Sequence, residues 1–75
     1  MRLKHFIEGL QILYPYFDDG NGFHIGAEHD EFYVYKTNKP LSKTDIDKLY
    51  SLGWFQDETE DADKYDVNYG WMAFT

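Results

Sequence analysis

A histidine flanked by acids is the first place in this chain where side chains suited to chemistry gather: Glu28, His29, Asp30 and Glu31. Imidazole and carboxylate groups are ligands that protein metal sites use, and His24 lies just upstream. Adjacent residues of a strand point to opposite faces, however, so these side chains do not all converge on one ion. An exposed turn is therefore the favoured interpretation, and we expect no bound metal. The alternative is a metal-binding or metal-dependent hydrolytic protein that uses His24, Glu28, His29 and Asp30.

Other catalytic chemistry has little support in the sequence. The chain has no cysteine, and Ser42 and Ser51 are interpreted as a helix cap and a helix-surface residue. The glycines at positions 20 and 22 precede a predicted strand and not a helix, so they do not form a phosphate-binding loop. A chain of 75 residues makes one domain, residues 1–75, and offers no deep cleft. We expect no enzyme activity and no cofactor.

The stretch from Gly22 to Tyr35 alternates apolar and polar residues on both sides of the charged turn, which predicts a two-stranded ribbon. If His29 and Asp30 are the central turn residues, the glutamates beside them face each other as an unfavourable like-charged pair. The same pairing places four residues on a core face: Ile25, Ala27, Phe32 and Val34. It places four others on an open face: His24, Gly26, Tyr33 and Tyr35. We expect Tyr33 to lie across Gly26, which has no side chain of its own.

A first helix is predicted before the ribbon, because apolar residues recur there at helical spacing. Its apolar stripe consists of Leu3, Phe6, Ile7, Leu10, Leu13 and Tyr14. The helix is expected to end near Leu13, since Pro15 disfavours helical geometry in the residue before it. Gly9 either weakens this helix or lets another group pack closely against it. His5 is expected on the polar surface.

A second helix has unusually complete start and stop signals. Ser42 is a good N-cap, and Asp45 completes a variant of the capping box that uses Asp in place of Glu. Leu41 and Ile46 are spaced as a hydrophobic staple across the helix start. Gly53 supplies the residue that ends the helix.

Two further strands complete the predicted fold: a short one over 54–56 and a last one from 67 or 68 to 74. The intervening segment, 57–66, is expected to be too polar for burial. The result is an α+β domain in α-β-β-α-β-β order, with two layers. Both helices cover one face of an antiparallel sheet of about four strands. The open face then receives either Trp54 or Phe55, and either Trp71 with Ala73 or Met72 with Phe74.

Charge and aromatic content limit the possible partners. The net charge is −7, which disfavours direct binding to nucleic acid or to anionic membranes and favours a protein with a basic surface. The chain contains 2 Trp, 7 Tyr and 6 Phe, more than a core of this size needs. The surplus is expected on the open sheet face, where Tyr and Trp are typical of protein interfaces. The lack of cysteine fits a cytoplasmic location.

An acidic run precedes the last strand, and only Lys64 offsets it: Asp57, Glu58, Glu60, Asp61, Asp63 and Asp66. A solvated loop is the simpler interpretation. The functional interpretation is a docking surface for a Lys- and Arg-rich site, which would mainly raise the association rate.

Three short motifs resemble a group of small uncharacterised proteins from bacterial and bacteriophage genomes. They are Ala27-Glu28-His29-Asp30, Leu52-Gly53-Trp54 and Trp71-Met72-Ala73-Phe74, within the pattern A-E-H-D … L-G-W … W-x-x-F over residues 22–75. The resemblance implies an α+β cytoplasmic protein, in the host cytoplasm if a phage encodes it. It implies no activity and no functional residues.

The sequence thus favours a small, acidic, non-enzymatic protein-binding module, such as a phage-type inhibitor or modulator of a host protein. Its expected partner-binding residues are His24, Tyr33, Tyr35, Asp57, Glu58, Glu60, Asp61 and Asp63. A structural homodimer, paired through a sheet edge or face, is a further alternative.

Overall fold

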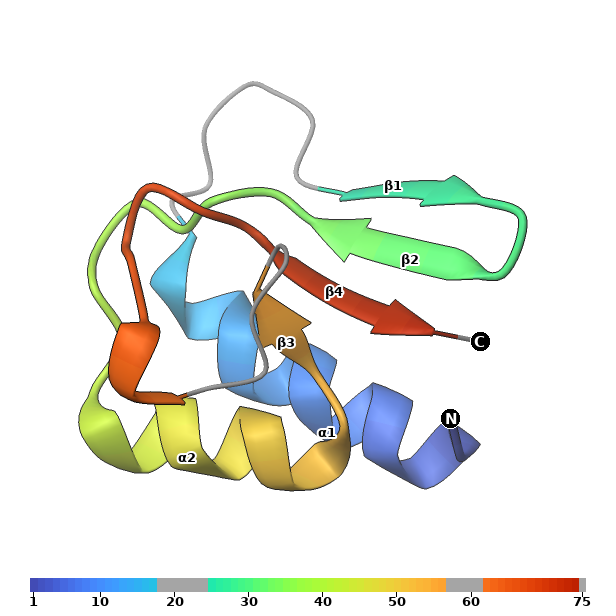
Figure 1. Ribbon diagram of the computed structural model, residues 1–75, viewed down its shortest axis with the longest axis horizontal. Helices are drawn as coiled ribbons and strands as arrows, with labels where there is room; N and C mark the ends of the chain where they lie inside the picture. The colour runs from blue at the N-terminus through green and yellow to red at the C-terminus, as the bar shows by residue number, and fades with distance from the viewer. Residues whose placement is uncertain (18–24, 57–61, 75) are drawn as a thin grey trace.

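The chain folds as the sequence predicts, into two helices and a four-stranded antiparallel sheet in α-β-β-α-β-β order. The computed structural model describes residues 1–17, 25–56 and 62–74. Its helices and strands are α1 (Leu3–Leu13), β1 (Ile25–Glu28), β2 (Glu31–Val34), α2 (Lys43–Leu52), β3 (Phe55–Gln56) and β4 (Trp71–Phe74). Two 3-10 turns, η1 (Tyr14–Tyr16) and η2 (Ala62–Lys64), lie between them. The strand order across the sheet is β1-β2-β4-β3 (Figure 1).

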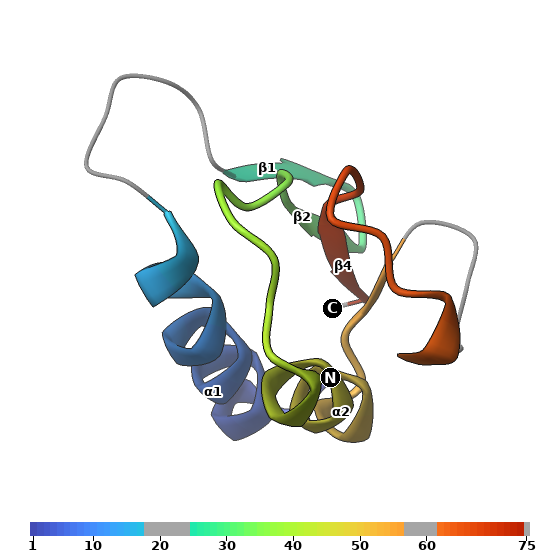
Figure 2. The same ribbon diagram turned by 90° about the vertical axis from the view of Figure 1, so that its left-hand side faces the viewer.

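Both helices lie on the same face of the sheet, with α1 on the side of β1 (Figure 2). The space between the layers is filled by large side chains, the biggest of which are Trp54, Trp71, Leu13 and Leu49. Phe32 meets Phe6 edge to face, with ring centroids 4.9 Å apart, and so joins β2 to α1. Two tryptophans in so small a core supply the apolar area that a chain of this length otherwise lacks.

The position of α1 is fixed by a close approach at Gly9. A Cβ atom at Gly9 would overlap with Nε1 of Trp54, and the indole donates a hydrogen bond from Nε1 to the carbonyl oxygen of His5, at 3.3 Å. The same indole stacks on Phe6, at 5.6 Å between centroids. Of the two roles foreseen for Gly9, close packing is the one observed.

The face of α1 that is buried differs from the one that its apolar stripe predicted. Leu13 is buried as predicted, but Leu3 and Tyr14 are 72% and 74% exposed and Ile7 is also exposed. Gly9 is buried in their place, and His5, predicted on the surface, is half-buried. The helix presents its glycine to the core because the indole ring needs that space.

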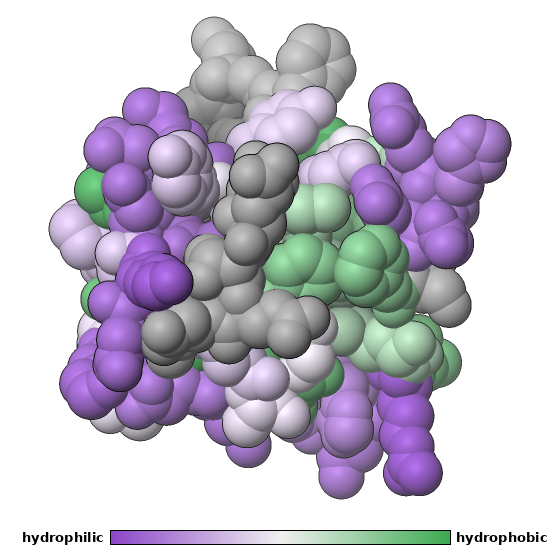
Figure 3. Space-filling view, viewed as in Figure 1, coloured by the Kyte–Doolittle hydropathy of each residue, from purple (hydrophilic) through white to green (hydrophobic). Residues whose placement is uncertain are grey.

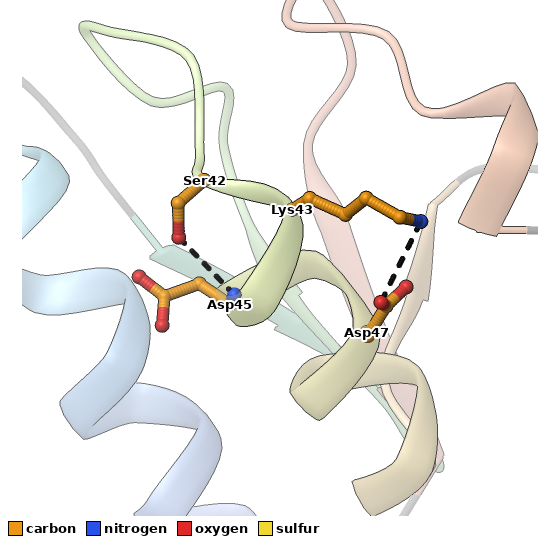
Figure 4. A network of polar contacts seen from close by, with 4 residues as sticks. All are labelled: Ser42, Lys43, Asp45 and Asp47. Atoms are coloured by element: carbon orange, nitrogen blue, oxygen red, sulfur yellow. Dashed lines mark hydrogen bonds and ion pairs between the residues drawn. The ribbon is translucent and has the colours of Figure 1, made fainter.

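The start of α2 has the predicted N-cap, but Tyr16 and not Asp45 bonds the Ser42 amide. Ser42 caps the helix, since its hydroxyl accepts a hydrogen bond from the Asp45 amide at 3.2 Å (Figure 4). The Asp45 carboxylate accepts a hydrogen bond from the hydroxyl of Tyr16, which in turn accepts one from the Ser42 amide at 3.2 Å. Tyr16 therefore takes the place of the returning arm of the capping box and ties η1 to α2. The helix ends at Gly53, which has φ 98°, as predicted.

The β1–β2 ribbon has the predicted register, in which Ile25 pairs with Val34 and Glu28 with Glu31. His29 has φ 46°, and it is the one non-glycine residue in the described ranges with positive φ. A positive φ at the first central residue only is the sign pattern of a type II′ turn, which favours glycine there.

Two details of the ribbon were predicted wrongly. Ile25 and Ala27 point to the helix side but are exposed, and Ile25 is 57% exposed. They are at the edge of the sheet, and the helices and core residues do not cover them. The tyrosine nearest to Gly26 is Tyr35 and not Tyr33, because the Tyr35 hydroxyl oxygen lies 3.1 Å from where a Cβ of Gly26 would be.

The last strand is shorter than predicted, since it begins at Trp71. Tyr65 and Asp66, assigned to a segment too polar for burial, are half-buried, and Tyr65 stacks on Trp71 at 6.1 Å. Within the described parts of the chain, no helix has the length and apolar character needed to cross a bilayer.

Replacing Gly9 with Ala should lower the free energy of unfolding by about 1–3 kcal/mol, because the added methyl group forces Trp54 out of position. This is the reverse of the gain of up to about 1 kcal/mol expected at an exposed helix position. Urea denaturation would measure it, with Gln11→Ala, an exposed site on the same helix, as the control. A stabilised Gly9→Ala protein would contradict the assigned packing.

Replacing His29 with Gly should raise the free energy of unfolding by about 0.5–1 kcal/mol, because glycine adopts a positive φ without strain. Thermal unfolding followed by circular dichroism would measure the change. Asp30→Gly is the matched control and should not stabilise, since φ at Asp30 is not positive. Equal effects of the two variants would refute the assigned turn.

Candidate functional site

The candidate site is the outer face of the sheet, the face that points away from the helices. Val34, Trp71 and Ala73 are buried on the helix side, so alternation along each strand sends their neighbours outward. The outer face is defined here by five side chains: Tyr33, Tyr35, Phe55, Met72 and Phe74. Tyr33 and Phe55 both pair with Met72, one from each neighbouring strand, so these residues form a continuous row across three strands.

Apolar side chains gather on this face and remain open to solvent. The rings of Phe55 and Phe74 lie 5.2 Å apart, and Phe74 is 51% exposed. Figure 3 shows this hydrophobic patch to the right of the centre, over β4. Tyr35 is exposed as well, whereas Tyr33, Phe55 and Met72 are half-buried. Clusters of partly exposed aromatic and thioether side chains are typical of protein interfaces.

A shallow hollow of about 510 Å³ continues the patch toward the far end of β2. Tyr33, Tyr35 and Met72 line it from the sheet, and Asn68 and Gly70 line it from the segment that leads into β4. Gly70 is required there, because a Cβ would overlap with the carbonyl oxygen of Val34. The hollow is open to solvent, so it suits a side chain or loop of a partner better than an enclosed small substrate.

Tyr33 and Tyr35 each contact a neighbouring residue that restricts the orientation of the ring. The Tyr33 hydroxyl donates a hydrogen bond to the carboxylate of Glu31, two residues earlier on the same face. The Tyr35 ring reaches across to Gly26 on β1. Rings whose orientation is already fixed lose little conformational entropy when a partner covers them.

Gln56 holds the segment that forms the second wall of the hollow. Its side chain is fully buried and donates hydrogen bonds to the carbonyl oxygens of Asp66, at 2.7 Å, and Tyr69, at 3.2 Å. It also accepts one from the Asp66 amide at 2.8 Å. A neutral amide is needed here, because one side chain has to act as donor and acceptor at once.

The structure brings together some of the predicted site residues and separates others. Tyr33 and Tyr35 lie together on the outer face, Tyr33 half-buried and Tyr35 48% exposed. Asp63 is exposed on η2, which packs against α2, at the opposite end of the molecule from the β1–β2 turn (Figure 1). The remaining predicted residues lie outside the described ranges: His24, Asp57, Glu58, Glu60 and Asp61.

Three residues of the outer face were only alternatives in the sequence: Phe55, Met72 and Phe74. Side chains alternate between the two faces of a strand, so each of these residues points either to the helices or to solvent. The sequence of strands this short does not determine which. The register with β2 decides which face they take. Tyr33 pairs with Met72, and the residues next to each of them along the strand point to the helix side.

The residues proposed for the metal alternative do not form a site where they are described. Glu28, His29 and Asp30 are all exposed at the hairpin tip. Among residues 1–17, 25–56 and 62–74, no three acidic, histidine or cysteine side chains are grouped so that they could hold an ion.

Comparison of the chain with protein-family models, with curated proteins and with solved structures found no match.

Replacing Gln56 with Leu should lower the free energy of unfolding by about 1–3 kcal/mol, because it removes three part-buried hydrogen bonds to backbone groups of Asp66 and Tyr69. Gln56→Glu retains the acceptor but loses the donors, and it should be destabilising as well. Chemical denaturation would measure both, with Gln11→Leu as the exposed control. A Leu variant as stable as the wild type would show that the hydrogen bonds of Gln56 are not needed.

Proposed function

We propose that this chain is a non-enzymatic binding module that docks on another protein through the outer face of its sheet. The observation that carries the proposal is the row of Tyr33, Met72, Phe55 and Phe74, with the open hollow beside it. Phe74 is exposed and the other three are half-buried. The row supplies apolar area and the hollow supplies a recess, the two elements of an interface hot spot.

The charge of the chain supports a partner with a basic surface. A net charge of −7 accelerates encounter with a positive partner and disfavours contact with phosphate-rich polymers. Glu28, Asp30 and Glu31 lie at one end of the outer face, at the turn between β1 and β2. The acidic residues predicted for docking, Asp57, Glu58, Glu60, Asp61 and Asp63, are part of that net charge.

The biological role that fits such a module is inhibition or modulation of a host protein by a phage-type product. The support is the resemblance of Ala27-Glu28-His29-Asp30, Leu52-Gly53-Trp54 and Trp71-Met72-Ala73-Phe74 to small bacterial and bacteriophage proteins. A cytoplasmic location belongs to the same proposal. A binding role also fits the outer face better than catalysis does, since its described residues are mostly aromatic and apolar and its hollow is shallow.

Replacing both Phe55 and Phe74 with Ser should reduce capture of the partner roughly tenfold or more while the domain stays folded, because both rings are partly or largely exposed in the free protein. The measurement is affinity capture from host lysate at low and high salt, with quantitation of retained proteins. Leu3→Ser, which removes an exposed apolar side chain from α1, is the control.

Capture should also weaken at high salt, because charge attraction is screened over about 8–10 Å at physiological ionic strength. If no protein is retained in either salt, or if the double variant retains the same proteins as the wild type, the outer face is not the docking surface.

A further inference from the structure

We infer that the free edge of β1 binds an extended segment of a basic protein by strand addition. The inference rests on the proposed function, that this chain binds a protein, and it assigns the binding to a second surface and to a specific type of segment. The segment would alternate apolar and basic residues and would lie alongside β1 as a fifth strand.

The first observation is the position of β1 in the sheet. The strand order places β1 at an edge, and within the described residues it pairs with β2 alone. Natural edge strands are commonly protected by Lys, Pro or a bulge. β1 has the sequence Ile-Gly-Ala-Glu, and only its last residue is charged. Its pairing with β2 is regular over all four residues, without a bulge.

The hydrogen-bonding phase of β1 follows from its turn. Glu28 and Glu31 flank a two-residue turn and pair with each other, which makes them the pair that exchanges hydrogen bonds. Alternation then directs the backbone groups of Gly26 toward β2 as well. The amide and carbonyl groups of Ile25 and Ala27 are therefore the ones that point to the free edge.

The second observation is apolar surface on the helix side of this edge. Ile25 is 57% exposed although its partner Val34 is buried, and Ala27 is exposed beside it. Ile7 and Tyr14 of α1 are exposed too, and α1 lies on the same side of the molecule as β1 (Figure 2). An added strand with apolar residues on that side would cover Ile25 and Ala27 and extend the core beyond α1.

The third observation is the charge on the opposite side of the edge. Glu28 and Glu31 lie directly across from each other on the outer face, and such a like-charged pair is destabilising. The Tyr35 ring reaches over Gly26 toward the edge. A Lys or Arg of the added strand would be close to the two carboxylates and to the face of that ring, and it would offset their repulsion.

Charge also selects the occupant. A second copy of this chain would bring another net charge of −7 to the same edge, whereas a basic segment lowers the total charge. An extended basic segment therefore fits the edge better than a second copy does.

The probe is a short capped peptide that alternates Lys and Val, added to the labelled protein and followed by amide hydrogen exchange with NMR detection. Exchange at the Ile25 and Ala27 amides should slow about tenfold or more, since they gain partners. The Gly26 and Glu28 amides, already directed toward β2, should keep their rates. A peptide that alternates Glu and Val should have no effect.

Ala27→Pro is the decisive variant, because it removes the outward amide and leaves the pairing with β2 intact, as proline at a solvent-facing edge position does. It should abolish peptide binding, whereas Ala27→Ser, which keeps the amide, should not. Glu28→Gln should weaken binding about two- to fivefold. Near-ultraviolet circular dichroism checks that each variant is folded.

The outcomes separate this inference from the proposed function. Strand addition is wrong if exchange at Ala27 is unchanged at millimolar peptide or if Ala27→Pro binds as well as Ala27→Ser. Perturbation confined to Met72 and Phe74 would place the peptide on the outer face and leave the proposed function standing. Protection of the Ile25 and Ala27 amides in the free protein, rising with its concentration, would identify a second copy as the occupant and overturn the inference.

Discussion

The contact between Trp54 and Gly9 is the constraint on which the rest of the structure depends. The indole lies where a side chain of α1 would otherwise be, and it is fully buried between the end of α2 and the sheet. Its hydrogen bond to the His5 carbonyl fixes the distance between α1 and the residue that leads into β3. Phe6 stacks on the same ring and also contacts Phe32. The Trp54 side chain therefore fixes how the helical layer packs on the sheet.

This arrangement determines which surfaces are left uncovered. α1 presents Gly9 and Leu13 to the core, and Ile7 and Tyr14 are exposed. The helices do not extend under the whole edge strand, and Ile25 remains exposed on their side of the sheet. On the opposite face, Phe55, Met72 and Phe74 have no covering layer among the described residues. The single helical layer therefore leaves apolar surface exposed in two places, the edge at β1 and the outer face of the sheet. The two proposed interactions use these two surfaces.

Polar groups in this domain mostly position segments. Gln56 holds the turn before β4, and Tyr16 connects η1 to the first turn of α2. The hydrogen bonds of Gln56 and the bond from Tyr16 to Asp45 are part-buried, so water replaces them less easily than it replaces exposed ones. The ion pairs Lys4–Glu8 and Lys43–Asp47 are exposed and contribute little to stability.

The sequence by itself determined the features that depend on neighbouring residues. Ser42 and Gly53 bounded α2 because capping is a local interaction. The end of α1 at Leu13 was also predicted, but Tyr14 keeps helical geometry and begins the 3-10 turn η1 that contains Pro15. The alternation around His29 and Asp30 fixed the register of β1 with β2. Only the tertiary structure decided which side of α1 is buried, because a ring from Trp54, far along the chain, occupies the space at Gly9. It also decided that Phe55, Met72 and Phe74 form the outer face, because strands this short take their orientation from the partners they pair with.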